Sequence, residues 1–146
     1  MKKGVYKKRE SERKRLWAHL LGRELEAISE SLYFSGVARE DYPELADIFC
    51  EMGHAHAENT KRLEAMLKCD GGRYGFQKKI RINTDKIHKG GIEEMISRSC
   101  TRYREDLLSY ERLYLLSEEE REEDLIKEIL RASNERLSIL EKILKT

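Results

Sequence analysis

The sequence predicts an all-α protein, a ferritin-like four-helix bundle in which two antiparallel helical hairpins are joined by a long crossover. Three observations lead to this prediction. The 146 residues contain a single proline and are rich in Glu, Lys, Arg and Leu, which favour helices. Apolar residues recur at the three- and four-residue spacings of amphipathic helices. A segment at about residues 69–91, with paired glycines near each end, is long enough to run the length of a bundle.

The first helix is expected over about residues 11–40, ending at the segment EDYPE, because a residue that precedes proline is disfavoured in the helical conformation. The second helix is expected over about residues 43–68, since proline is well suited to a first helical turn. The periodicity places the third helix at about residues 92–117 and the fourth at about residues 122–144.

Residues 1–15 form a basic segment that runs into the first helix, and residues 16–146 form the predicted bundle. The segment has eight basic and two acidic side chains, although the whole chain has a net charge of only +1. Such a segment is expected to be a solvated, partly frayed arm, and it could also contact anionic partners. No apolar region follows it, so no secretory signal is predicted. No stretch approaches the roughly 20 apolar residues of a membrane span.

The three cysteines are isolated in the sequence. Cys50, Cys69 and Cys100 form no C-x-x-C pair. Their spacing argues against a zinc ribbon, a rubredoxin-type iron site and a disulfide framework. A reducing, cytoplasmic environment is therefore expected.

The predicted second helix contains a spacing that is typical of metal ligands, Glu51-x-x-His54, followed by His56. At about 100° per residue, however, Glu51 and His54 fall away from the apolar stripe. His56 and Asn59 fall beside the centre of that stripe. The helical phase therefore predicts that His56 and Asn59 face the core and that Glu51 and His54 face solvent.

The other helices also have polar residues within their apolar stripes. On the first helix Glu24 lies in the middle of the stripe, whereas Glu26 and Glu30 are expected to point outward. A carboxylate in a core is costly unless it is paired, hydrogen-bonded or bound to metal. Taken together, the four helices predict a buried polar network of Glu24, His56, Asn59, Tyr103, Asp106, Ser133 and Arg136.

Three tyrosines of the third helix share its apolar face. Tyr103, Tyr110 and Tyr114 recur at helical spacing and are expected to be core residues whose hydroxyl groups are hydrogen-bonded. Cys100, on the same face, is expected to be a small core residue. No catalytic residue is assigned from these positions.

The segment VAREDYPELADIFCEMGHAHAENTKRLEAML resembles the first hairpin of a rubrerythrin, a branch of the ferritin-like superfamily. The glycine-flanked crossover and the closing ERLSILEKIL are similar to the same family, and the resemblance covers roughly residues 16–145. It implies a four-helix bundle without the rubredoxin domain, homodimer formation, and peroxide or oxygen chemistry at a pair of irons.

In that family two helices each supply a Glu and two others each supply a Glu-x-x-His to the irons. The resemblance places these positions at Glu24, at His56 and Asn59, at Tyr103 with Asp106 nearby, and at Ser133 and Arg136. Only the first of them keeps the family's residue type, and an arginine has no lone pair to offer a metal.

Two interpretations of the interior remain open. In the first, the di-iron site is degenerate, no cofactor is bound, and Arg136 replaces the metal charge by pairing with Glu24 or Asp106. In the second, one iron, manganese or zinc ion is held by Glu24, His56 and Asp106, with Asn59 as a further ligand.

A third interpretation concerns the basic arm and the crossover. Tyr74 and Phe76 lie among basic residues of the crossover, a composition that can bind single-stranded nucleic acid or another anion. The nearly neutral net charge favours instead that these aromatic residues hold the crossover against the bundle. Nucleic acid is therefore not the expected partner.

Overall fold

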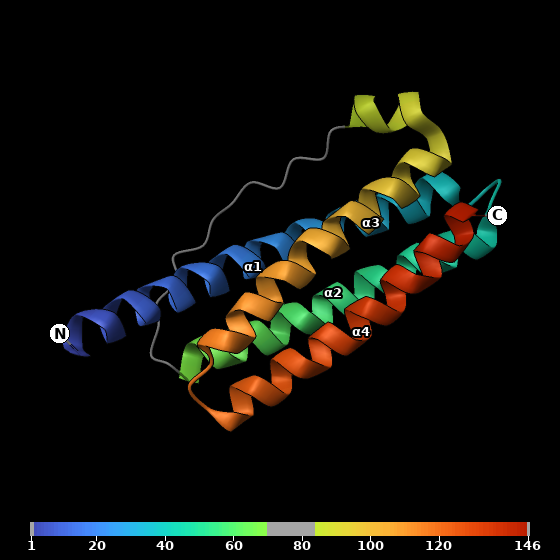
Figure 1. Cartoon of the computed structure of the whole chain (residues 1–146). Helices are drawn as coiled ribbons and strands as arrows, with labels where there is room; N and C mark the ends of the chain where they lie inside the picture. The colour runs from blue at the N-terminus through green and yellow to red at the C-terminus, as the bar shows by residue number, and fades with distance from the viewer. Residues whose placement is uncertain (1, 70–83, 146) are drawn as a thin grey trace.

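The computed structural model describes residues 2–69 and 84–145. Within these ranges the chain forms four helices: α1 (Lys2–Ala38), α2 (Pro43–Cys69), α3 (Thr84–Leu116) and α4 (Glu120–Lys145). Figure 1 shows them as a bundle in which α1 pairs with α2, and α3 pairs with α4. The predicted all-α four-helix bundle of two hairpins is therefore confirmed, and α2 begins at Pro43 as the sequence predicts.

The first helix begins nine residues earlier than expected, at Lys2. The basic segment is therefore helical and continuous with α1. Its side chains contact the end of α3: the Arg9 guanidinium donates to the carbonyl of Leu115 at 3.1 Å, and Arg112 pairs with Glu12 at 2.8 Å. These contacts explain why the segment continues the helix, since a frayed arm would forgo them.

The predicted crossover falls mainly on residues 70–83, outside the described part of the chain, and so do Tyr74 and Phe76, which are expected to hold it against the bundle. Its last part belongs to α3, which begins at Thr84 and is interrupted at Gly91. Gly91 has φ of 67°, in the left-handed region that glycine adopts without steric cost. The regular run of α3 thus begins just after Gly91, close to the predicted start.

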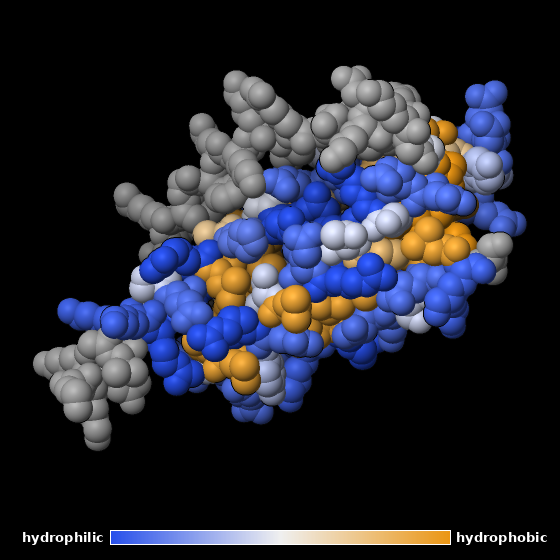
Figure 2. Space-filling model, turned by 45° about the horizontal axis from the view of Figure 1, so that its top comes forward, coloured by the Kyte–Doolittle hydropathy of each residue, from blue (hydrophilic) through white to orange (hydrophobic). Residues whose placement is uncertain are grey.

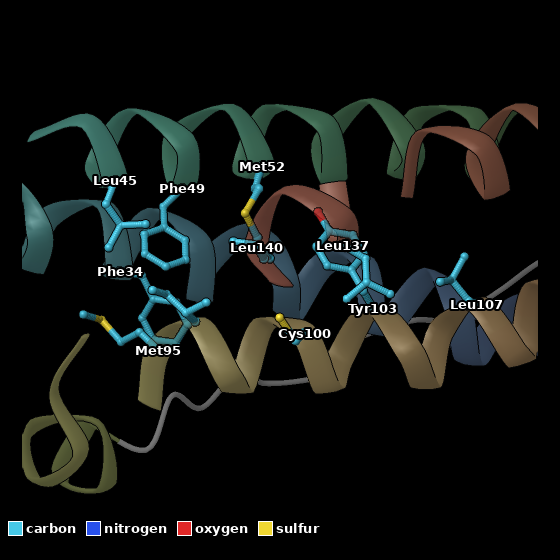
Figure 3. Packing of buried hydrophobic residues seen from close by; sticks show 11 residues of the cluster. Phe34, Leu45, Phe49, Met52, Met95, Cys100, Tyr103, Leu107, Leu137 and Leu140 are labelled. Atoms are coloured by element: carbon cyan, nitrogen blue, oxygen red, sulfur yellow. The ribbon is translucent and has the colours of Figure 1, made fainter. Parts of the chain in front are cut away.

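The apolar core consists of two clusters at opposite ends of the bundle. The first cluster lies toward the turn between α1 and α2, where the rings of Phe34 and Phe49 meet edge to face at 5.3 Å. Figure 3 shows both rings beside Met95 of α3. The second cluster contains Trp17, whose indole N–H donates to the carbonyl of Leu63 at 3.0 Å. Each cluster draws residues from all four helices.

A layer of buried polar residues separates the two apolar clusters. On α1, α2 and α4 these residues fall in the sequence between the two clusters, and on α3 Asp106 precedes Leu107, the last member of the first cluster on that helix. The layer includes Glu24 on α1, His56 and Asn59 on α2, Asp106 on α3, and Ser133 on α4. The bundle therefore places the candidate site near the middle of its length.

The surface in Figure 2 is largely hydrophilic, with separate orange patches of apolar residues. The exposed apolar side chains include Leu108 and Leu115 of α3 and Tyr42 in the turn between α1 and α2. No helix in residues 2–69 and 84–145 is long and apolar enough to cross a membrane.

Replacing Leu63 by alanine is expected to destabilise the bundle. Leu63 is fully buried in the second cluster, and loss of its side chain leaves a cavity that costs about 3 kcal/mol in the free energy of unfolding. The matched control is Leu115→Ala, because Leu115 is 64% exposed. That change should cost less than about 0.5 kcal/mol. Urea denaturation measures both, and equal costs would contradict the packing described here.

Candidate functional site

The helical phase of α2 places its polar residues as the sequence predicts. His56 is 4% exposed and Asn59 is 8% exposed. Glu51 and His54 are exposed to solvent. The conspicuous Glu51-x-x-His54 pair is therefore a surface feature, and the residues that reach the interior are His56 and Asn59.

The centre of the polar layer is the carboxylate of Glu24, which is 2% exposed. Its Oε2 lies 2.7 Å from Nδ1 of His56. Its Oε1 accepts hydrogen bonds from the hydroxyl of Tyr110 at 2.6 Å and from the Asn59 amide at 3.3 Å. Nδ1 of His56 carries a proton when it donates to the ionised carboxylate. The two oxygens thus have three donors, which come from α2 and α3.

Two further contacts involve His56, one at its ring and one at its backbone carbonyl. The ring stacks on that of Tyr103, with centroids 5.4 Å apart and an interplanar angle of 24°. One turn along α2, the Thr60 hydroxyl donates to the carbonyl of His56 at 2.9 Å. The imidazole is therefore held between the carboxylate of Glu24 and the face of Tyr103.

Asp106 has a different partner from the predicted one. The Arg23 guanidinium donates to its carboxylate through Nε at 2.7 Å, which links α1 to α3. Burial raises the pKa of Asp106 above its ordinary value, and the charge of Arg23 offsets part of that rise. With His56, Asn59 and Tyr110 on Glu24, and Arg23 on Asp106, the predicted pairing of Arg136 with either carboxylate is wrong.

Glu30 also differs from expectation, because it is only 5% exposed. Two arginines of α3 cover it: Arg98 lies 3.2 Å and Arg102 lies 3.3 Å from its Oε2. Arg102 also lies 3.7 Å from Glu26. The angle of Glu30 on the helix places it off the apolar stripe, but the long arginine side chains of the neighbouring helix bury it.

Sequence reasoning missed several members of this site. Arg23, Arg98 and Arg102 lie off the apolar stripes and were not expected to pair with buried carboxylates. The four-residue spacing of the last two, matching Glu26 and Glu30 on α1, was the available signal. Tyr110 was assigned to the core, but its hydroxyl was not linked to Glu24.

The hydroxyl of Tyr103 is an exception to the expectation for the tyrosines. The side chain is 4% exposed, and its hydroxyl has no hydrogen-bond partner among the residues that the structure describes. Burial raises the pKa of Tyr103 above its ordinary value, and the charge of Arg136 opposes that rise. The phenol therefore remains protonated at neutral pH. Cys100, by contrast, is fully buried in the first cluster, as predicted.

A cavity of about 190 Å³ opens beside the site, between α2 and α4. Its lining includes His56 and Asn59 of α2, Tyr103 of α3, and Ser133 and Arg136 of α4. Ser133 is 6% exposed, and Arg136 is partly buried. The cavity lies between neighbouring helices that contact each other less than α1 contacts α2 or α3 contacts α4.

The residues present do not fit a pair of irons. Both oxygens of Glu24 already accept hydrogen bonds, and Asp106 is paired with Arg23. Within the two described ranges, no group of three or more His, Cys, Asp and Glu side chains is placed to hold a metal ion. In this arrangement the buried carboxylate of Glu24 instead accepts hydrogen bonds from donors of the protein itself.

Models of protein families, curated proteins and solved structures were compared with the chain, and none of them matches it. The resemblance to rubrerythrins therefore remains an expectation from residues 16–145.

Removing the hydroxyl of Tyr110 should cost much more than removing that of Tyr103. Tyr110→Phe deprives the Glu24 carboxylate of a donor at 2.6 Å, and the loss of a hydrogen bond to a charged group costs about 2 kcal/mol. Tyr103→Phe removes a buried hydroxyl without a described partner, so it should leave stability within about 0.5 kcal/mol or raise it. Urea denaturation of both variants tests this, and equal losses would count against the hydrogen-bond assignment.

The free energy of unfolding should fall at alkaline pH. Burial, and then the charge of Glu24, raise the pKa of Tyr110 well above its ordinary value near 10. The contribution of Tyr110 is complete below the unfolded pKa and is lost as pH rises toward the folded pKa. The loss amounts to about 1.4 kcal/mol per pH unit above pH 10.

The free energy of unfolding, measured from about pH 9 to about pH 11.5, tests this dependence, because a phenol titrates in this range. Tyr110→Phe should flatten the slope by that amount. Tyr42→Phe is the matched control, because Tyr42 is 53% exposed. It should keep the slope of the unmodified protein. A Tyr110→Phe slope equal to that of the control would show that the phenol is not the cause.

Proposed function

We propose that the chain is a rubrerythrin-related bundle that does not act as a di-iron oxidoreductase and in which a hydrogen-bond network takes the place of the metals. The observation that carries this proposal is the set of hydrogen bonds to Glu24, the one position that keeps the family's ligand type. Its oxygens accept from His56, Asn59 and Tyr110 at 2.7, 3.3 and 2.6 Å. These contacts use three of the roughly four lone-pair sites of the carboxylate, which leaves about one for a metal.

Charge balance supports the same proposal. A di-iron centre brings several positive charges, which the family neutralises with several carboxylates. The described interior has Glu24 and Asp106 at the corresponding positions, and Arg23 already neutralises Asp106. A network of this kind fixes the register of the helices, whether or not it adds net stability.

A single divalent metal held by Glu24, His56 and Asp106 is the less favoured alternative. Nδ1 of His56 contacts Glu24 at 2.7 Å, which leaves Nε2 as the nitrogen for a metal, but Asp106 would have to release Arg23, also at 2.7 Å. That release leaves a buried polar group without its partner, which costs about 1–3 kcal/mol.

In this proposal the bundle acts through its surface or through association with a second copy, rather than by redox chemistry at its centre. A homodimer, as the resemblance implies, is part of the proposal. So is a reducing, cytoplasmic environment, which the free thiols of Cys50 and Cys100 support.

Elemental analysis tests the proposal on protein expressed in medium supplemented with iron, manganese and zinc and purified without chelator. Far less than one metal ion per chain is expected. Added metal should leave the melting temperature unchanged, since a ligand stabilises only the state that binds it. Two irons per chain would contradict the proposal. One stoichiometric metal that Glu24→Gln abolishes would establish the single-metal alternative instead.

A further inference from the structure

We propose that the cavity between α2 and α4 binds a small monocarboxylate anion, with Arg136 as its cationic partner. The inference goes beyond the proposed loss of di-iron chemistry, because it assigns a ligand to the open side of the polar layer. It rests on the cavity, on an arginine and on a tyrosine hydroxyl, and it does not depend on the resemblance to rubrerythrins.

The cavity is a defined space rather than a gap between helices. It has a volume of about 190 Å³ and is walled by side chains from α2, α3 and α4. Arg62 of α2 and Glu128 of α4 also line it, and their ion pair at 3.3 Å joins the two helices there. Ala55 and Ala132 contribute small apolar surfaces. The space therefore combines polar groups with room for a methyl or methylene group.

Arg136 is the cationic group in this cavity that is available to pair with an anion. It is partly buried, and it has no hydrogen bond or ion pair with any residue in the described part of the chain. By contrast, the interior arginines Arg23 and Arg102 each have a carboxylate within reach. A guanidinium presents a planar set of donors that matches a carboxylate in two parallel hydrogen bonds. Arg136 is thus a preformed partner for an anion.

A second, independent observation points into the same space. The Tyr103 hydroxyl is buried and has no partner among the described residues, and Tyr103 is one of the residues that line the cavity. Figure 3 shows the Tyr103 side chain crossing from α3 toward α2 and α4, with the oxygen at its far end. Burial keeps this phenol protonated, so it is a donor. A ligand oxygen would satisfy this unpaired hydroxyl once the side chains that cover it move aside, since the hydroxyl oxygen has almost no accessible surface.

Size and charge select the class of ligand. A water molecule has a share of about 30 Å³ of liquid volume, so the cavity has room for about six waters or a similar number of ligand heavy atoms. Acetate, propionate and lactate fit this limit. Glu58 and Glu128 also border the cavity, and Arg62 is already paired with Glu128. A single negative charge therefore suits the site better than the double charge of phosphate.

Calorimetric titration of the protein with the sodium salts of acetate, propionate, lactate and inorganic phosphate, at constant ionic strength maintained with sodium chloride, tests this proposal. Saturable binding with a Kd on the order of 1 mM is expected for a ligand this small. Acetamide, a neutral molecule of the same shape, should not bind. This comparison needs no variant, so it remains decisive even if a substitution prevents folding.

Variants then assign the binding to the cavity. Arg136→Gln should weaken acetate binding at least tenfold, and Tyr103→Phe should weaken it about threefold to tenfold, because each removes a donor to a charged group. The matched control is Arg131→Gln, which makes the same change of charge on α4. Arg131 is exposed and pairs with Glu135 at 2.9 Å. It should bind acetate as the unmodified protein does.

Four outcomes would overturn the proposal. They are the absence of saturable binding by acetate, propionate and lactate, equal binding of acetamide and acetate, unchanged affinity in Arg136→Gln, and tighter binding of inorganic phosphate than of acetate. The first two remove the anion site, the third removes its assignment to Arg136, and the last removes its assignment to a monocarboxylate.

Discussion

The constraint on which the rest of the structure depends is the carboxylate of Glu24, placed at the centre of a helical bundle. A buried ionised group is tolerated only when donors or cations surround it. Here His56, Asn59 and Tyr110 supply those donors from two other helices. Each donor reaches the carboxylate only if the helix that carries it has a fixed rotation and height. One carboxylate thereby sets the register of α1, α2 and α3 relative to one another.

This constraint divides the core and leaves one side of the bundle less tightly packed. The polar layer separates two apolar clusters, and each cluster alone packs side chains from all four helices. At the level of the layer α4 contributes Ser133 and Arg136, which make no described hydrogen bond to Glu24. The cavity between α2 and α4 lies on this side. The side of the bundle that makes no described hydrogen bond to Glu24 is therefore the side on which the proposed anion site lies.

The sequence predicts the fold and the faces of the helices well, because helical phase is a local property. It correctly directs His56 and Asn59 inward and Glu51 outward. It does not predict partners, since phase gives an angle around one helix but not the reach of a long side chain from another. Arg23 therefore reaches Asp106 without a signal in the stripe pattern, and arginines of α3 bury Glu30.

The most direct test of the central role of Glu24 is a double-mutant cycle with Glu24→Gln, Tyr110→Phe and the double variant, measured by urea denaturation. If the Tyr110 hydroxyl stabilises the charge of Glu24 through its hydrogen bond of 2.6 Å, the losses in the free energy of unfolding from the two changes are not additive. A coupling free energy of about 1–3 kcal/mol is predicted. A coupling within about 0.3 kcal/mol of zero, with all variants folded, would contradict a core organised around this carboxylate.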